Sequence, residues 1–228
     1  MQRFVAALSM VAMTLTVVAH ADTLDLSGMG FGSFAMKVTS LKEARFKATL
    51  RQQYDFSCGS AALATLLSHH YGQPASEQMI FEEMFASGDQ EKIRKQGFSL
   101  LDMKNFLKKR GFDADGFELP LATLQKSGLP AIVLVSDKGY QHFVVIKGLR
   151  DGRILLGDPA GGSRALSIAA FEALWSNKVL FVIHNRRDKA QFNLAADWQV
   201  NPRAPLSQGV NLEGLGFLAL TKFGPGDF

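Results

Sequence analysis

The sequence contains a single cysteine, Cys58, among 228 residues. A lone thiol excludes an internal disulfide. An unpaired cysteine is more often a small buried apolar residue than a reactive one. In an oxidising compartment a free thiol is a liability unless it is buried or used, so the neighbours of Cys58 must decide its role.

A large excess of charge of one sign is also missing. The net charge is +4, and it is spread too evenly to favour a nucleic-acid partner. The chain has no repeat of fixed period and no low-complexity tract, and its 47% of hydrophobic residues is sufficient for a core. One basic stretch has helical spacing and is interpreted as a solvated helix face: Lys104, Lys108, Lys109 and Arg110.

Long apolar runs are limited to one, from Phe4 to Ala19, which follows a short positive start. Ala19-His20-Ala21 then has small residues at the two positions that a signal peptidase reads. Because the run is near the short end for crossing a bilayer, we interpret residues 1–21 as a cleaved signal peptide rather than a membrane anchor. The expected mature protein begins at Asp22, is periplasmic, and makes no stable membrane insertion.

Helical spacing dominates the first half of the mature chain. Apolar residues recur at intervals of three and four over residues 58–71, which predicts a helix. Ser76 and Ser99 are placed to cap two further helices, with a polar loop over residues 88–97 between them. The last of these helices is expected to bury Leu101, Phe106 and Leu107.

The second half changes to short β-branched runs separated by turn residues. Strands are predicted over residues 131–135, 142–146, 154–156 and 179–183. Turn signals stand at Asp137-Lys138-Gly139, Asp151-Gly152 and Gly161-Gly162, and a short helix is expected over residues 167–175. Helices followed by an antiparallel sheet predict an α+β fold.

The two ends of the mature chain have a different composition. In residues 22–49, glycine alternates with larger residues from Gly28 to Ser33, which predicts an extended segment that packs as an edge strand. Residues 185–228 contain several prolines and glycines among apolar residues, and we interpret them as a tail that packs partly back.

Cys58 stands at the N-terminal end of its predicted helix. The positive end of the helix dipole and the free backbone N–H groups of that turn favour a thiolate. Gly59 leaves the sulfur uncrowded, and small residues follow at 60–62, so the helix is able to approach a sheet closely. On these local features alone, a nucleophile and a buried apolar residue are equally compatible with Cys58.

A thiol nucleophile needs a base, and the chain has few histidines. His20 leaves with the signal peptide, and His69 and His70 lie three turns further along the same helix, too far from the thiol. His142 is favoured over His184 because it begins a strand directly after a turn, where a side chain points across a cleft.

An imidazole that shuttles protons also needs an orienting group. Asp158 closes the next strand of the same hairpin, and adjacent antiparallel strands place the start of one beside the end of the next. A glutamine amide just upstream of Cys58, together with the Cys58 N–H, is suited to stabilise a tetrahedral oxyanion. Spacing alone leaves Gln52 and Gln53 both open.

Three blocks of the sequence resemble the peptidase C39 family. The stretch from Gln52 to Leu63 resembles its Q-x5-C-G-x-A-A-L signature, and residues 142–146 with 157–159 resemble its H-(Y/F)-V-V-I…D-P block. The resemblance runs from Leu50 to Ile183, and we treat residues 50–184 as the peptidase domain. It implies a papain-like fold, a triad of Cys58, His142 and Asp158, Gln52 as the oxyanion donor, and no metal or other cofactor.

The resemblance also implies a function. Many C39 peptidases are N-terminal domains of peptide-exporting ABC transporters and cut leader peptides after Gly-Gly. This sequence shows no transporter spans and no phosphate-binding loop, and Ser57 stands where many members carry Asp or Glu. It looks most like the free-standing, exported C39-like peptidases of functional-amyloid secretion systems. The resemblance thus implies a cysteine endopeptidase of limited specificity, with a protein or peptide substrate such as a component of amyloid export.

Two other interpretations of the same residues remain. One is a papain-like cell-wall amidase, which digestion of purified peptidoglycan would reveal. The other is a C39-like module that binds a peptide without cutting it. The presence of Cys58, His142, Asp158 and Gln52 together argues against the second.

Overall fold

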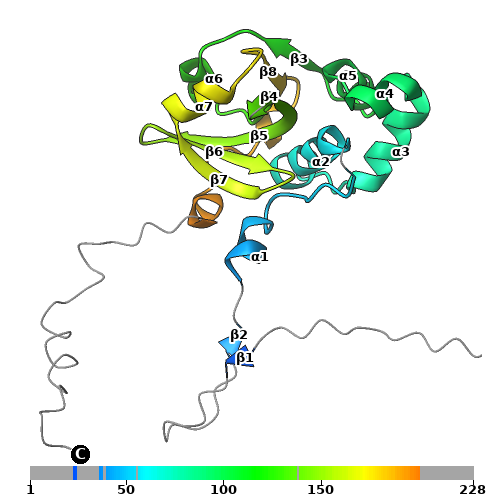
Figure 1. Ribbon diagram of the computed structural model, residues 1–228. Coiled ribbons are helices and arrows are strands. Elements are labelled where there is room, and N and C mark those ends of the chain that lie inside the picture. The colour runs from blue at the N-terminus through cyan, green and yellow to red at the C-terminus, as the bar shows by residue number, and fades with distance from the viewer. Residues whose placement is uncertain (1–22, 25–35, 38–39, 55, 138, 201–228) are drawn as a thin grey trace, which may run out of the picture. The chain divides into compact units, whose positions relative to one another are not determined.

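The computed structural model describes residues 23–24, 36–37, 40–54, 56–137 and 139–200 (Figure 1). The chain divides into two units, residues 1–40 and residues 41–228. In the first unit, β1 (Thr23–Leu24) pairs antiparallel with β2 (Met36–Lys37). The expected signal peptide, the alternating stretch from Gly28 to Ser33 and residues 201–228 lie outside the described residues.

The second unit begins with a series of helices. They are α1 (Leu41–Arg45), α2 (Cys58–Thr65), α3 (Glu77–Ser87), α4 (Gln90–Gln96) and α5 (Leu100–Lys109). The end of α2 continues as a π-helical segment, η2 (Leu66–His70). The caps predicted for two of these helices are present, because Ser76 accepts the N–H of Met79 at 3.2 Å and Ser99 forms a capping box with Asp102.

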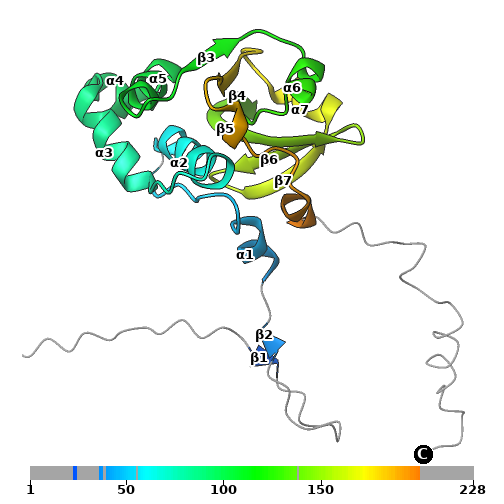
Figure 2. The same ribbon diagram turned by 180° about the vertical axis from the view of Figure 1, so that it is seen from behind.

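An antiparallel six-stranded sheet follows, in the order β3-β8-β4-β5-β6-β7. Its strands are β3 (Ala114–Phe117), β4 (Ala131–Asp137), β5 (Tyr140–Arg150), β6 (Arg153–Asp158), β7 (Gly162–Ser167) and β8 (Leu180–Ile183). Two short helices, α6 (Leu121–Ser127) and α7 (Ile168–Leu174), lie on the side of the sheet opposite α2–α5 (Figures 1 and 2). The described chain ends with η3 (Arg187–Lys189) and η4 (Ala195–Val200).

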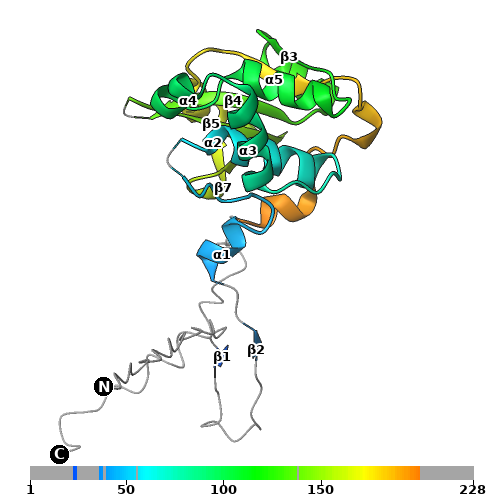
Figure 3. The same ribbon diagram turned by 90° about the vertical axis from the view of Figure 1, so that its right-hand side faces the viewer.

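The central strand β5 is buried on both faces. Phe143 and Val145 join the cluster formed with α2, α3 and α5, whereas Val144 and Ile146 join the cluster formed with α6 and α7. This alternation is the period of two that an extended strand imposes. The strand therefore lies against α2 (Figure 3), and this junction of helix and sheet holds the residues discussed below.

The predicted α+β arrangement is confirmed, but parts of the helical half were assigned wrongly. Residues 88–97 are not simply a polar loop, since they contain α4, which Asp89 caps by accepting the N–H of Lys92 at 3.1 Å. This short helix buries only Ile93, so it leaves no periodic apolar signal. Leu101 is 63% exposed, and Met103 instead shares the buried face of α5 with Phe106 and Leu107.

The sheet is also larger than the sequence indicated. Gly162 was expected in a turn, but it begins β7, an edge strand with little β-branched character. The Asp151-Gly152 turn is confirmed, with φ of 52° and 68°, as a two-residue hairpin loop requires. The basic residues predicted to form a solvated face of α5 are not all solvated. Arg110 makes a bidentate ion pair with Glu83, with N–O distances of 2.5 and 2.6 Å.

Candidate active site

Cys58 is the first residue of α2, and only 8% of its surface is exposed. The close packing of this turn explains Gly59, although the reason differs from the one expected. A Cβ at Gly59 would lie 2.8 Å from Cε of Met103 and 3.1 Å from Cβ of Phe98. The glycine therefore lets α2 approach α5 and fixes the start of the helix, rather than simply leaving space beside the sulfur.

The surroundings of the Cys58 thiol act on its pKa in opposite directions. Burial raises the pKa, and the charge of Asp158 adds to that effect. The backbone N–H groups of Phe143, Gly59 and Cys58 lower it, but the net direction is upward. The expectation that the helix start favours a thiolate is therefore outweighed by burial, and the resting thiol is neutral and needs a base.

His142 lies near the start of β5, where it pairs with Val135 of β4. Its Nε2 is 3.3 Å from Oδ2 of Asp158. Its Nδ1 is buried and has no hydrogen-bond partner among the described residues. The ring of Tyr140 stacks on the imidazole with centroids 5.5 Å apart. One ring nitrogen is thus held by a carboxylate while the other remains available for a proton.

Asp158 ends β6 and is nearly fully buried. Its Oδ1 accepts the N–H groups of Ala160 at 2.9 Å and Gly161 at 3.2 Å, and its Oδ2 lies 3.1 Å from Arg164. Burial opposes the charged form, but His142, the Ala160 N–H and Arg164 together hold the pKa of Asp158 below its usual range. The carboxylate stays charged beside the imidazole.

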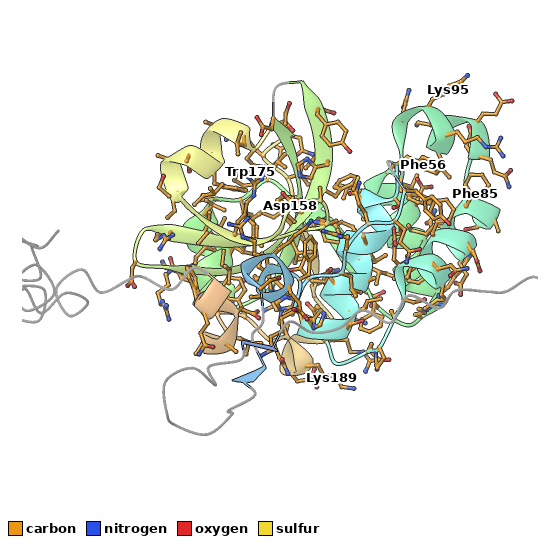
Figure 4. All side chains as sticks on the ribbon, turned by 60° about the horizontal axis from the view of Figure 1, so that its bottom comes forward. Phe56, Phe85, Lys95, Asp158, Trp175 and Lys189 are labelled. Atoms are coloured by element: carbon orange, nitrogen blue, oxygen red, sulfur yellow. The ribbon has the colours of Figure 1, made fainter. Side chains whose placement is uncertain are left out.

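The pairing of β5 with β6 makes Asp158 a diagonal neighbour of His142 rather than a directly opposite one. Val145 pairs with Gly157, which places Asp158 across from Val144, two residues along from His142. Residues 142 and 144 point to the same face of β5. The two side chains therefore meet on one face of the sheet, where Figure 4 shows Asp158.

Gln52 lies beside this end of β6. Its N–H donates to the carbonyl of Pro159 at 3.1 Å, and its Oε1 is buried without a hydrogen-bond partner among the described residues. Gln53, which spacing alone left as an alternative, is exposed, and its N–H donates to Glu77 at 3.0 Å. The structure thus brings Gln52, rather than Gln53, to the carboxylate end of the hairpin.

Two of the other described histidines, His70 and His184, have different partners. His184 lies 2.9 Å from Asp115 of β3, and His70 Nδ1 lies 2.7 Å from the carbonyl of Gln191. Burial lowers the pKa of His70 to about 4, so it is neutral at physiological pH. Both side chains are therefore engaged away from the start of α2.

Three residues near this junction were not expected from the sequence. Arg164 comes from β7, Glu77 from α3, and Tyr140 precedes His142 by two residues. Only Tyr140 had a signal, because residues two apart on a strand share a face. Arg164 and Glu77 reach the site through tertiary packing, which no local pattern records.

Across the described ranges, no group of three or more His, Cys, Asp or Glu side chains is arranged to hold a metal ion. None of the described helices is both long enough and apolar enough to cross a bilayer.

A helix that begins at a cysteine and packs on a sheet strand carrying a histidine is the arrangement of papain-like peptidases. The chain belongs to the peptidase C39 family, whose model matches residues 46–187. This match confirms the predicted family and fold, and it makes the protein a peptidase.

Known proteins resemble the chain over most of its length. It is 39% identical over 171 residues to the probable functional amyloid protease FapD of Pseudomonas aeruginosa, and equally to the protein of that name from Pseudomonas fluorescens. Each match covers 75% of this chain and 76% of the relative. Among solved structures, the peptidase domain of Streptococcus ComA, a bifunctional ABC transporter involved in quorum sensing, has a TM-score of 0.50 and 25% identity. That match covers 60% of this chain and 97% of the ComA domain.

Proposed function

We propose that the protein is an exported cysteine endopeptidase of limited specificity, with Cys58 as nucleophile and His142 as its base. The observation that carries this proposal is the state of the His142 ring. Its Nε2 is held by Asp158, whereas its buried Nδ1 has no partner among the described residues. Because the Cys58 thiol is buried and neutral, a nearby nitrogen that is free to accept its proton is what the reaction requires.

The proposed reaction has two halves, and in each half His142 takes up one proton and then releases it. Nδ1 of His142 takes the proton of the Cys58 thiol as the sulfur attacks the carbonyl carbon of the scissile bond. The side-chain amide of Gln52 and the N–H of Cys58 stabilise the oxyanion. The imidazolium then gives its proton to the leaving amine, which leaves a thioester on Cys58. Water attacks this thioester, His142 again carries the proton, and the acid product and free thiol are released.

Asp158 has an orienting role in this proposal. It fixes the ring through Nε2 and stabilises the imidazolium that forms during each half of the reaction. Arg164 and the two backbone N–H groups in turn fix the carboxylate. The charge of Asp158 is thereby held next to the ring and away from solvent.

The proposed substrate is a protein of an export or amyloid-secretion system, cut after a Gly-Gly-type site. The similarity to the FapD proteins supports the amyloid context. The small exposed fractions of Cys58 and His142, 8% and 6%, support a narrow cleft that excludes larger side chains. We place the enzyme in the periplasm, with residues 1–21 as signal peptide, 22–49 as N-terminal extension, 50–184 as peptidase domain and 185–228 as C-terminal extension.

Replacement of Cys58 by alanine in the producing organism tests this function. Mass spectrometry of the exported proteins would compare cells with the wild-type protein and cells with Cys58→Ala. We expect one or more exported proteins to keep an uncut segment in the variant. Unchanged processing would refute the cysteine-peptidase function, and release of peptides from purified peptidoglycan by the wild type would favour the amidase.

A further inference from the structure

The carboxylate of Glu77 lies buried beneath the loop that leads to Cys58. Glu77 is the first residue of α3, and only 5% of its surface is exposed. An acidic side chain this deeply buried is uncommon unless it has a partner. Its partners here belong to the short loop between Gln52 and Cys58, not to another charged side chain.

One oxygen of Glu77 makes both of its contacts with this loop. Oε1 accepts the N–H of Gln53 at 3.0 Å and the hydroxyl of Ser57. The carboxylate therefore contacts both ends of the loop. Within the loop, the Ser57 hydroxyl also accepts the N–H of Tyr54 at 3.1 Å. Gln53 directly follows Gln52, and Ser57 directly precedes Cys58.

A second residue of α3, Phe81, contacts the aromatic side chains of the same loop. Phe81 follows Glu77 by one helical turn and therefore lies on the same face of α3. The ring of Phe81 lies 5.5 Å from that of Tyr54 and 5.6 Å from that of Phe56. Phe85, one turn further, stacks on Phe81 at 5.6 Å; Figure 4 labels Phe56 and Phe85, the two residues on either side of the Phe81 ring in this chain of contacts.

We propose that Glu77 is a positioning residue of the peptidase, which holds the loop so that the Gln52 amide and the Cys58 sulfur keep the separation required by one oxyanion. This inference rests on the roles proposed above for Gln52 and Cys58. Misplacing a donor or nucleophile by about 1 Å costs about 10²-fold in rate, so a loop between the two needs rigid support.

The contacts indicate that Glu77 acts through hydrogen bonding to the loop rather than through its charge. Its other oxygen, Oε2, is buried without a hydrogen-bond partner among the described residues. A glutamine presents an oxygen at the place of Oε1, and its nitrogen takes a place where the carboxylate already lacks a partner. Glu77→Gln should therefore keep the loop in position, whereas Glu77→Ala should release it.

Steady-state kinetics on a Gly-Gly peptide substrate test this inference. We expect Glu77→Ala to lower kcat at least tenfold with KM within about twofold, because the effect falls on the transition state. Glu77→Gln should recover kcat to within about threefold of the wild type. Glu82→Ala, which removes an exposed acid of the same helix, is the matched control and should leave both constants unchanged.

Ser57→Ala keeps the test decisive if Glu77→Ala does not fold, and a double variant with Gln52→Ala tests whether the two residues act together. Ser57→Ala removes one end of the link and leaves the Gln53 contact, so it should lower kcat in the same direction by a smaller factor. In a Gln52→Ala background, the extra loss caused by Glu77→Ala should shrink, since both changes act on the same donor. Ultraviolet titration of the Cys58 thiolate should give the same pKa in Glu77→Gln and wild type.

Wild-type kcat in Glu77→Ala would overturn the inference, as would a Glu77→Gln variant as impaired as Glu77→Ala. Either result leaves the proposed function intact, provided that Cys58→Ala is inactive on the same peptide. An active Cys58→Ala variant would instead remove the proposed function itself.

Discussion

At the scale of single residues, the two ring nitrogens of His142 have different surroundings in the candidate site. Nε2 of His142 lies 3.3 Å from a carboxylate, and Nδ1 is buried with no partner among the described residues. A base that both takes and returns a proton needs one fixed and one free nitrogen. The carboxylate is in turn fixed by Arg164 at 3.1 Å, so three elements of the sheet orient the ring.

Loss of the proposed base, His142, should be more damaging than loss of its proposed orienting group, Asp158. We expect His142→Ala to lower kcat by about 10²–10⁴-fold, the range typical of general acid–base catalysis. Asp158→Asn should be milder, because an amide still occupies the position beside Nε2. The control is His184→Ala, whose imidazole contacts Asp115 on β3. If His184→Ala were inactive and His142→Ala normal, the base would have been assigned to the wrong residue.

Removal of the Gln52 amide should slow turnover with little change in substrate binding. A donor to the oxyanion acts on charge that appears only in the transition state, and losing one typically costs about 10²–10³-fold in kcat. Gln53→Ala is the neighbouring control, since that side chain is exposed and the Gln53 contact with Glu77 uses only the backbone N–H. Measurement of kcat and KM for both variants shows which glutamine is the oxyanion donor. A larger loss of kcat in Gln53→Ala than in Gln52→Ala would assign that role to Gln53.

At the scale of elements, a single bulge in β5 brings His142 and Asp158 to the same face. Lys147 is the extra residue, because Ile146 pairs with Leu156 while Gly148 pairs with Leu155. Without the bulge, Asp158 would pair with Val145 and point to the opposite face from His142. The irregular strand is thus required for the contact on which the site depends.

The hairpin and its turn could be predicted from the sequence, but the bulge could not. The Asp151-Gly152 turn and the flanking apolar runs indicated that the end of β6 lies near the start of β5. Nothing in the apolar pattern marked Lys147 as unpaired. Arg164 was missed for a related reason, since residues 162–167 contain few strand-forming side chains and were not recognised as β7.

Lys147, the extra residue of the bulge, also binds residues 193–197, which follow the sheet. It is fully buried, its Nζ donates to the carbonyl of Ala48 at 2.9 Å, and it lies 3.2 Å from Oδ2 of Asp197. Burial lowers the pKa of Lys147, and the charge of Asp197 opposes that shift. The N–H of Asn193 donates to the Lys147 carbonyl at 2.9 Å, so residues 193–197 lie along β5 beyond the family match.

Asp197→Ala should destabilise the protein, because it leaves the ammonium of Lys147 buried without its carboxylate. We expect the free energy of unfolding to fall by about 3 kcal/mol, the lower end for a broken buried pair. Denaturant unfolding measures this change. Asp188→Ala, which removes an exposed acid of η3, should change the same quantity by less than about 0.5 kcal/mol. Equal midpoints for both variants would show that the Lys147–Asp197 pair contributes little.

At the scale of the whole molecule, the helical layer supplies the thiol and the sheet supplies the imidazole and the carboxylate. In the proposed mechanism the substrate passes between the helical layer and the sheet, and both proposed reactive side chains are more than nine-tenths buried. We expect such a site to select by exclusion, since a steric clash costs more than a missing contact. Side chains further upstream in the substrate would supply the binding energy.

The two residues before the cut should therefore be glycines. A peptide series that varies these positions through Gly, Ala, Leu and Phe would measure kcat/KM for each. We expect a loss at every increase in size, with Leu and Phe at least about 10²-fold below Gly. Equal cleavage of the Leu and Phe peptides would refute the narrow cleft while leaving the proposed Cys58–His142 chemistry untouched.

Alkylation followed by intact mass spectrometry and an activity assay shows whether Cys58 is the nucleophile. The chain has one cysteine, so each carbamidomethyl adduct formed by iodoacetamide reports on that thiol alone. Because burial raises the pKa of the thiol, labelling in the His142→Ala variant should accelerate only above the ordinary thiol range of about pH 8.5. For the wild type we predict that peptidase activity falls in proportion to the singly labelled fraction. Full activity in a completely labelled sample would show that Cys58 is not the nucleophile.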